Sequence, residues 1–196
     1  MRRSDREIKD FDSIVAVMQK CDVCRLALNN DGYPYILPLN FGLTVADGRI
    51  ELYFHGAMEG LKYELMERDS RAGFEMDCAR RLVMEQKGEI CSCTMEYESV
   101  IGRGHMEIVP DEEKHGVLQS LMEHYHENVL PFSEAVAART KVFKLVVESV
   151  TGKARKKHKR WCHTCEHKGF PDLLAFAGIN AKKELVLLPD CAILGG

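Results

Sequence analysis

Short runs of alternating apolar and polar residues, separated by turn residues, fill most of the chain before residue 152. This alternation predicts a series of strands, at residues 23–28, 33–43, 49–55, 72–78, 90–100, 105–109 and 141–150. Asp31-Gly32 and Asp47-Gly48 separate the first three strands and are typical of hairpin turns in which glycine takes a positive φ. Gly102 and Gly104 predict a bulge or a bend, and a loop is expected around residues 80–89.

Helical spacing of apolar residues is confined to a few segments. A first helix is expected at residues 10–20, a short one after Gly60, a longer one opened by the acidic turn after Pro110, and a short one near 133–138. Consecutive hairpins with a few helices favour a mainly β fold with peripheral α, and specifically an antiparallel barrel.

The bulk composition is that of an ordinary soluble protein. The chain has 196 residues, 45% hydrophobic and 29% charged, with a net charge of -3, which gives no global signal for nucleic acid or an anionic membrane. Charges follow Met1 without an apolar run, and no stretch approaches the ~18 apolar residues of a membrane span, so we expect a cytoplasmic protein. The eight cysteines then fit a reducing compartment, and those in strand patterns (Cys24, Cys78, Cys91 and Cys93) are expected to be mostly small buried hydrophobes.

The composition changes at residue 152, where a basic linker begins. We therefore expect a domain at 1–155 and a separate linker and tail at 156–196. The tail groups Cys162, His163, Cys165 and His167, a spacing compatible with zinc. The Cys and His pairs overlap, however, so incidental cysteines are the favoured interpretation and no metal site is predicted.

Two stretches carry candidate chemistry. Residues 33–42 contain Pro34 and Pro38 in one strand, so the backbone there either faces a flat ligand or belongs to an edge strand. Residues 52–62 leave a strand, pass small residues and enter a helix, whose N-terminus together with Lys62 suits a phosphate. The alternative is that His55 only ends a strand and that Lys62 lies on a solvated helix face.

Together these stretches resemble the nitroimidazole-resistance (Nim-type) branch of the pyridoxamine 5'-phosphate oxidase-like flavoproteins, which bind flavin mononucleotide (FMN) in a split barrel. The resemblance covers about residues 1–155, and its motifs occur in the expected order. The matching segments are Gly32–Gly42, Leu52–Ala57 with Gly60 and Lys62, Phe74–Asp77 and Tyr97–Gly104.

The resemblance implies a six-stranded antiparallel split β-barrel that forms a homodimer with FMN at the subunit interface. By this analogy, Leu37, Pro38, Leu39 and Asn40 line the flavin ring, and Ser99 and Val100 approach it from another strand. His55, Gly56 and Lys62 lie near the ribityl phosphate or the substrate, with His55 as the candidate catalytic residue.

The implied activity is a reductase that takes electrons from NADH or NADPH and passes them to a small acceptor such as a nitroaromatic of the 5-nitroimidazole kind. His55 could supply a proton near neutral pH. Pyridoxal phosphate synthesis is not expected, because Tyr35–Pro38 replace the arginine-led motif of true oxidases and Trp161 lacks their following arginine. The alternative is a non-catalytic barrel that holds flavin or haem, with His105, His124 or His126 as axial ligands.

Overall fold

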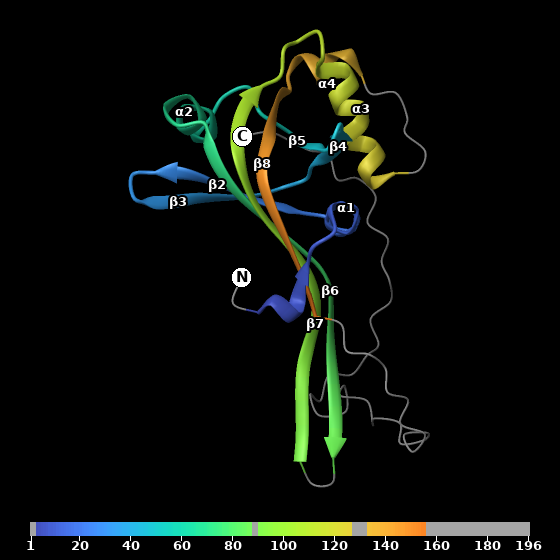
Figure 1. Ribbon diagram of the computed structural model, residues 1–196. Coiled ribbons are helices and arrows are strands. Elements are labelled where there is room, and N and C mark those ends of the chain that lie inside the picture. Colours follow the sequence, from blue (N-terminus) through green and yellow to red (C-terminus); the bar gives the residue numbers. More distant parts are fainter. Residues whose placement is uncertain (1–2, 88–89, 127–132, 156–196) are drawn as a thin grey trace, which may run out of the picture. The chain divides into compact units, whose positions relative to one another are not determined.

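The protein is described by a computed structural model at residues 3–87, 90–126 and 133–155 (Figure 1). Eight strands and five helical segments follow one another along these residues. In chain order they are the 3-10 turn Ser4–Arg6, β1 (Glu7–Ile8), α1 (Phe11–Met18), β2 (Cys24–Asn30), β3 (Tyr33–Leu39), β4 (Gly42–Ala46), β5 (Arg49–Gly56), α2 (Leu61–Arg68), β6 (Arg71–Lys87), β7 (Ile90–Ile108), α3 (Lys114–Tyr125), α4 (Glu134–Ala138) and β8 (Lys141–Arg155).

The strands form one antiparallel sheet in the order β3-β2-β6-β7-β8-β5-β4, with β1 paired to β8. The two edge strands, β3 and β4, follow one another in the chain, so the two edges of the sheet must come near each other. The described sheet therefore curls, but β3 and β4 do not pair to close it. This confirms the predicted mainly β antiparallel class. The described sheet has eight strands rather than six. Relative to the seven strands expected from the pattern, 90–100 and 105–109 form the single strand β7, 33–43 bends at Asn40-Phe41 into two, and β1 is added.

Side-chain alternation places the core on one face of the sheet. Fully buried residues include Leu26, Phe54 and Phe143, and the rings of Phe54 and Phe143 lie 5.5 Å apart. Helix α1 adds Ile14, Val17 and Met18 to this core. Helix α3 packs over β4, where a Cβ on Gly42 would lie 3.0 Å from the Cα of Leu121. Glycine at this position therefore lets helix and strand approach closely.

Both predicted hairpin turns are confirmed. Asp31 and Gly32 have φ values of 48° and 92°, and Asp47 and Gly48 have values of 51° and 73°. Positive φ at both central residues is the signature of a type I′ turn, whose twist matches that of the flanking strands. The predicted irregularity near Gly104 is also present, as a register shift between Arg103 and Gly104 on β7.

The expected loop at residues 80–89 is wrong. After a register shift between Cys78 and Arg81, β6 resumes pairing with β7 and the two continue as a long hairpin arm (residues 81–87 and 90–96) that extends away from the rest of the sheet (Figure 1). Ala79, with φ of 54°, marks the irregularity that absorbs the extra residues. Because this segment contains many polar residues, the alternating pattern of a strand could not be recognised in the sequence. Its pairing with β7 shows that it is a strand.

The arm also corrects one expectation about cysteines. Cys24 is buried and Cys78 half-buried, but Cys93 is exposed because it lies on the arm beyond the core. Leu82, Met84 and Met95 are exposed beside it, in the cross-strand pairs Leu82–Met95 and Met84–Cys93. The side chain of Cys91 lies outside the described residues.

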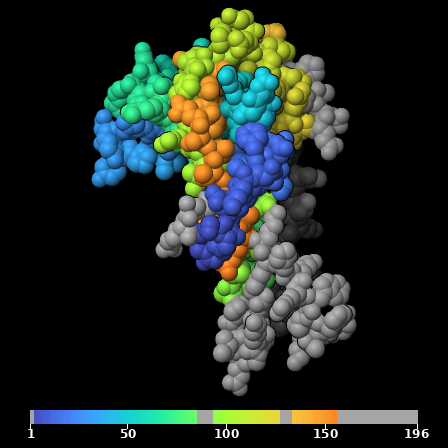
Figure 2. Space-filling model, viewed as in Figure 1, coloured from blue at the N-terminus to red at the C-terminus, as the bar shows by residue number. Residues whose placement is uncertain are grey.

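Among the described residues, no helix is both long and apolar enough to cross a membrane. The space-filling view shows the N-terminal segment and α1, in blue, lying against β8, in orange (Figure 2). The predicted division at residue 155 stays a prediction. The candidate zinc ligands of the tail and Trp161 lie outside the described residues.

Candidate functional site

The end of β5 and the start of α2 form a corner that carries two of the predicted site residues. Strand β5 ends at Gly56, and α2 begins at Leu61 after Gly60, whose φ of 135° is accessible mainly to glycine. No side chain caps the helix, and the N–H of Tyr63 donates to the carbonyl oxygen of Gly60 at 3.0 Å, so the partial positive charge of the helix start rests on the N–H groups of Leu61 and Lys62.

Two lysines gather at this corner around the ring of Tyr63. The Nζ atom of Lys62 lies 4.5 Å from the ring centroid, and that of Lys141 lies 4.3 Å from it. A Cβ on Gly56 would be 2.9 Å from Cε and 3.0 Å from Nζ of Lys62. The lysine therefore reaches back over the strand end, into space that only glycine leaves open.

The corner is held by local contacts. The hydroxyl of Tyr63 donates a hydrogen bond to the carbonyl oxygen of Ala57 at 2.7 Å, and Tyr63 packs edge-on against Phe143 at 5.6 Å. Lys141 arrives because β8 begins opposite the end of β5, with Gly56 and Lys141 as register partners. We name the group of Gly56, Lys62, Tyr63 and Lys141 the cationic corner; two ammonium groups near a helix start suit an anion such as a phosphate.

Sequence reasoning missed Lys141. It is the first residue of the last strand and lies far from Lys62 in sequence. Its only local signal was the position at a strand start, and its place at the corner depends on the pairing of β5 with β8. A pocket of about 370 Å³ adjoins the corner, lined by Tyr63, Met66, Glu67, Met106, Ile108 and Lys141.

His55 is exposed and precedes the corner, but its side chain points elsewhere. Successive strand residues alternate in direction, and Phe54 before it is buried, so His55 lies on the opposite face of β5 from the Gly56 position. Although His55 is exposed at the surface, the protein atoms around it partly desolvate the imidazole and lower its pKa. The lowered pKa favours the neutral form of the imidazole.

The β3 residues form a second group. Leu37 and Leu39 pack against the core, while Pro38 and Asn40 are exposed on the other face. Strand β3 is an edge strand with regular pairing, in which Pro38 faces Arg25. An edge position tolerates the missing N–H of proline, so the edge-strand interpretation of the two prolines is sufficient here.

Ser99 and Val100 form a third group on β7. Val100 is fully buried in the core, and Ser99 lies on the outer face between Asp77 of β6 and Lys153 of β8. Ser99 pairs with Lys153 of β8, and Gly56 pairs with Lys141 of the same strand, so the two partners are twelve positions apart along β8. That is roughly 40 Å of strand, so a single chain does not bring Ser99 to the cationic corner.

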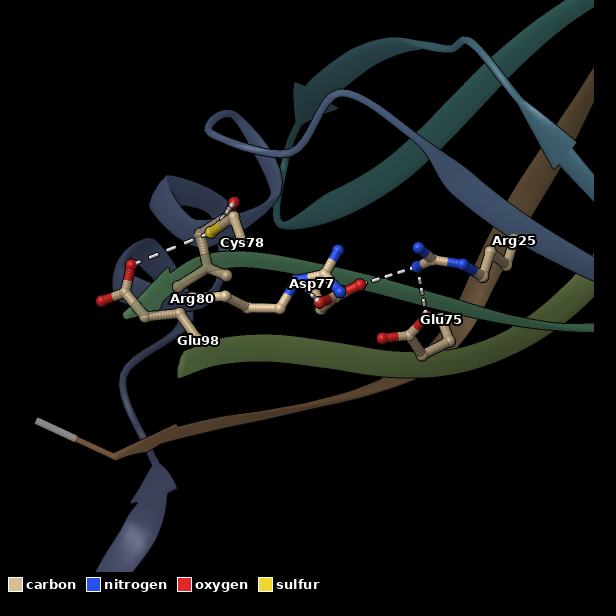
Figure 3. A network of polar contacts seen from close by, with 7 residues as sticks. Arg25, Glu75, Asp77, Cys78, Arg80 and Glu98 are labelled. Atoms are coloured by element: carbon tan, nitrogen blue, oxygen red, sulfur yellow. Dashed lines mark hydrogen bonds and ion pairs between the residues drawn. The ribbon is translucent and has the colours of Figure 1, made fainter. Parts of the chain in front are cut away.

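An ionic network occupies the outer face between the second and third groups (Figure 3). The Nη1 atom of Arg25 donates to Glu75 Oε2 at 2.8 Å and to Asp77 Oδ1 at 2.7 Å. Arg80 reaches the other oxygen of Asp77 at 2.7 Å. These bonds tie β2 to β6 beside Pro38, and the sequence pattern did not reveal them.

The histidines considered as haem ligands are engaged in other contacts. His105 bridges Glu148 and Glu107 at 3.1 Å each, and its hydrogen bond to Glu148 raises the pKa of its imidazole. His124 contacts the carbonyl oxygen of Cys21 at 2.9 Å, and its ring lies 4.4 Å from that of Phe41 at an interplanar angle of 46°. His126 is exposed. Within the part of the chain that the structure describes, no group of three or more His, Cys, Asp or Glu side chains could hold a metal ion.

A larger pocket, of about 640 Å³, lies away from the predicted residues. It is lined by the N-terminal segment, α1, Glu98 in the middle of β7 and the end of β8. Many of its charges are already paired, as in the contacts of Arg3 with Asp5 at 2.6 Å and of Lys20 with Glu98 at 3.0 Å. Its size alone therefore does not make it a better candidate than the cationic corner.

Comparison with known proteins agrees with the fold. A family model described as pyridoxamine 5'-phosphate oxidase matches residues 10–154. A solved structure from Bacteroides thetaiotaomicron, described as a 5-nitroimidazole antibiotic resistance protein, is 31% identical, with a TM-score of 0.65 over 76% of this chain and 86% of that one. No curated protein sequence matches the chain significantly.

Two further structures share the fold at 16% identity. The FAD and haem binding protein from Mycobacterium smegmatis has a TM-score of 0.65 and covers 96% of this chain and 94% of its own. The flavocytochrome Anf3 from Azotobacter vinelandii has a TM-score of 0.63, with coverage of 99% and 91%.

The sheet order and these matches define a split-barrel protein. The chain belongs to the pyridoxamine 5'-phosphate oxidase family, as the match over residues 10–154 establishes. The resemblance to the Nim-type branch is likewise confirmed by the Bacteroides structure. Membership in this family establishes the fold, whereas the reaction depends on the residues at the site.

Proposed function

We propose that this protein binds FMN, with the phosphate held at the cationic corner, and that it works as a reductase. The observation that carries the proposal is the convergence of Lys62 and Lys141 on Tyr63 beside Gly56. Of the two structures that share the fold at 16% identity, one is described as a flavocytochrome and the other as an FAD and haem binding protein. A flavin would supply hydride and electron transfer, which side chains alone do not.

The corner favours FMN over a flavin without a phosphate. A phosphate monoester carries about -1.5 to -2 charges near pH 7, and two ammonium groups match that charge. A hydrogen bond to a charged group contributes about 1.5–3 kcal/mol net, so one lysine accounts for about 10–100-fold in affinity. Riboflavin, which lacks the phosphate, would gain little from either lysine.

A homodimer would assemble the remaining groups. Ser99 and the corner are far apart in one chain, whereas a second copy could bring its own Ser99 and exposed β3 residues to that corner. Ile101 beside Ser99 and Ile36 beside Pro38 are 59% and 58% exposed on the outer face. Large apolar side chains in such places favour an interface between protein surfaces.

The proposed reaction takes electrons from NADH or NADPH to a nitroaromatic acceptor. Nitro reduction consumes protons together with electrons, and His55 is the candidate donor. Its lowered pKa makes the imidazolium a minor form but a stronger acid at physiological pH, so a proton taken up by His55 would pass readily to the acceptor.

The decisive experiment measures binding of FMN and riboflavin by quenching of flavin fluorescence. We expect Lys62→Ala and Lys141→Ala each to weaken FMN binding about 10–100-fold and to change riboflavin binding by less than about threefold. Lys9→Ala, at an exposed lysine away from the corner, is the matched control. Equal losses for both flavins, or no FMN binding by the wild-type protein, would remove the corner from the proposal.

Two further measurements address the dimer and the reaction. Light scattering should give twice the chain mass, and Ile101→Glu should shift the protein towards a monomer, with Arg103→Glu on the same face as control. His55→Ala should keep FMN but slow reoxidation of the reduced flavin by a nitroaromatic about 100-fold. An unchanged rate at full occupancy would exclude His55 from the reaction.

A further inference from the structure

Two thiols from distant parts of the sequence meet at the end of α1. The Sγ atom of Cys21 donates a hydrogen bond to the carbonyl oxygen of Val17 at 3.2 Å, and the Sγ atom of Cys78 contacts the same oxygen at 3.9 Å. Both sulfur atoms therefore lie at the same carbonyl oxygen. Cys21 follows α1 and Cys78 lies on β6, and 57 positions separate the two cysteines in the sequence.

The two cysteines differ in access. Cys21 is 1% exposed, whereas Cys78 is half-buried and lines a pocket of about 320 Å³ together with Lys20, Arg25 and Arg80. On its other side, Cys78 Sγ lies 4.0 Å from Oε2 of the buried Glu98, which pairs with Lys20 at 3.0 Å (Figure 3). A small molecule in the pocket can therefore reach Cys78, and Cys21 lies directly behind it.

We propose that Cys21 and Cys78 form a modification site at which a hydroperoxide produces an intramolecular disulfide. Cys78 is the attacking thiol because it faces the pocket, and Cys21 is the resolving thiol because it lies within contact of Cys78 and is shielded from solvent. Asp22 and Asp77 line the same pocket as the three cations, and among these charges that of Lys20 favours the thiolate of Cys78.

The chemistry is balanced in two steps. The Cys78 thiolate attacks one oxygen of hydrogen peroxide, the O–O bond breaks, Cys78 sulfenic acid forms, and the departing hydroxide becomes one water with the proton that Cys78 gave up on ionising. The Cys21 sulfur then attacks the Cys78 sulfur, the S–S bond forms, and the sulfenic oxygen leaves with the Cys21 proton as a second water. Two thiols are oxidised by two electrons in total, and one peroxide is reduced to two waters.

The surroundings of the two thiols also set the rate at which peroxide oxidises them. Burial raises the pKa of both thiols, and the charges of Glu98 and Asp77 raise that of Cys78 further, while the charge of Lys20 acts to lower it. Because only the thiolate reacts, oxidation is slow at neutral pH and speeds up about tenfold per pH unit as long as the pH is below the pKa. The pair thus stays reduced unless peroxide persists.

The test treats the full chain with hydrogen peroxide, digests it without reductant and maps cross-links by mass spectrometry. We expect a peptide pair joined through Cys21 and Cys78, two hydrogens lighter than the reduced peptides and restored by dithiothreitol. The cross-link closes a long loop, so the oxidised protein should melt about 5–10 °C higher. A wild-type map with no Cys21–Cys78 link, or with Cys78 joined to another cysteine, would overturn the proposal.

Variants sharpen the assignment of roles. Cys21→Ser should leave Cys78 to proceed to sulfinic acid, since the resolving thiol is missing. Cys24→Ser, at a fully buried cysteine on the adjacent strand, is the matched control and should still form the link. If Cys21→Ser protects Cys78 as well, the roles are wrong. The wild-type cross-link map decides the proposal even if a variant does not fold.

Discussion

Replacement of Gly104 by alanine tests how closely β7 and β8 approach at the register shift. A Cβ on Gly104 would overlap the carbonyl oxygen of Val146, and it would lie 2.8 Å from the carbonyl carbon of Val146 and 3.1 Å from the Cα of Val147. All three are backbone atoms, which cannot rotate away as a side chain can. The two strands would have to separate at the bulge.

The size of the effect follows from these contacts. Overpacking costs about 1–3 kcal/mol in general, and contacts with backbone place Gly104→Ala at the upper end, about 3 kcal/mol. Gly116, within α3, is the control, because a Cβ there meets nothing within 4 Å. Alanine in a helix stabilises by about 0.5–1 kcal/mol relative to glycine. Gly116→Ala should therefore raise the free energy of unfolding, whereas Gly104→Ala should lower it.

Urea unfolding followed by circular dichroism measures both changes. With a slope near 2 kcal/mol/M, typical for small proteins, the midpoint for Gly104→Ala should fall by about 1.5 M, and that for Gly116→Ala should rise slightly. The reasoning is refuted if Gly104→Ala unfolds at the wild-type midpoint, or if both variants lose stability equally.

The remaining predictions concern the corner and the histidines. Gly56→Ala should change the free energy of unfolding by less than about 1 kcal/mol, because its Cβ meets mainly the flexible end of Lys62; it should still weaken FMN relative to riboflavin in the fluorescence titration, and equal weakening would contradict the corner geometry. His55 should titrate below 6.5 because of burial, and His105 above it because of its bond to Glu148; NMR titration of the ring protons checks both, and identical midpoints would contradict the two environments. The stabilisation linked to His105 is present below pH 6.5 and lost as the pH rises through its folded pKa, whereas that linked to His55 is present above pH 6.5 and lost as the pH falls. Below pH 6.5, His105→Gln should therefore lower the free energy of unfolding, because it removes a stabilising contribution. On the same acid side, His55→Gln should raise the free energy of unfolding, because it removes a destabilising contribution.

Features decided by neighbouring residues could be predicted from the sequence. The alternation in β2 and β5 and the Asp-Gly turns before β3 and β5 depend on periods and φ preferences that act over a few residues. The same local motifs, taken in order, gave the resemblance to the Nim-type branch. Gly56 and Lys62 were also within reach of the sequence, because one strand end and one helix start bring them together.

Tertiary structure decided everything that depends on register between distant strands. Lys141 reaches Lys62 only because β8 starts opposite the end of β5. Cys21 meets Cys78 because the end of α1 lies against β6. The arm at residues 81–87 is a strand because β7 supplies its partner. Periodicity fixes which face a residue occupies, but it carries no information on which other strand lies beside it, and here the packing of the sheet made that choice.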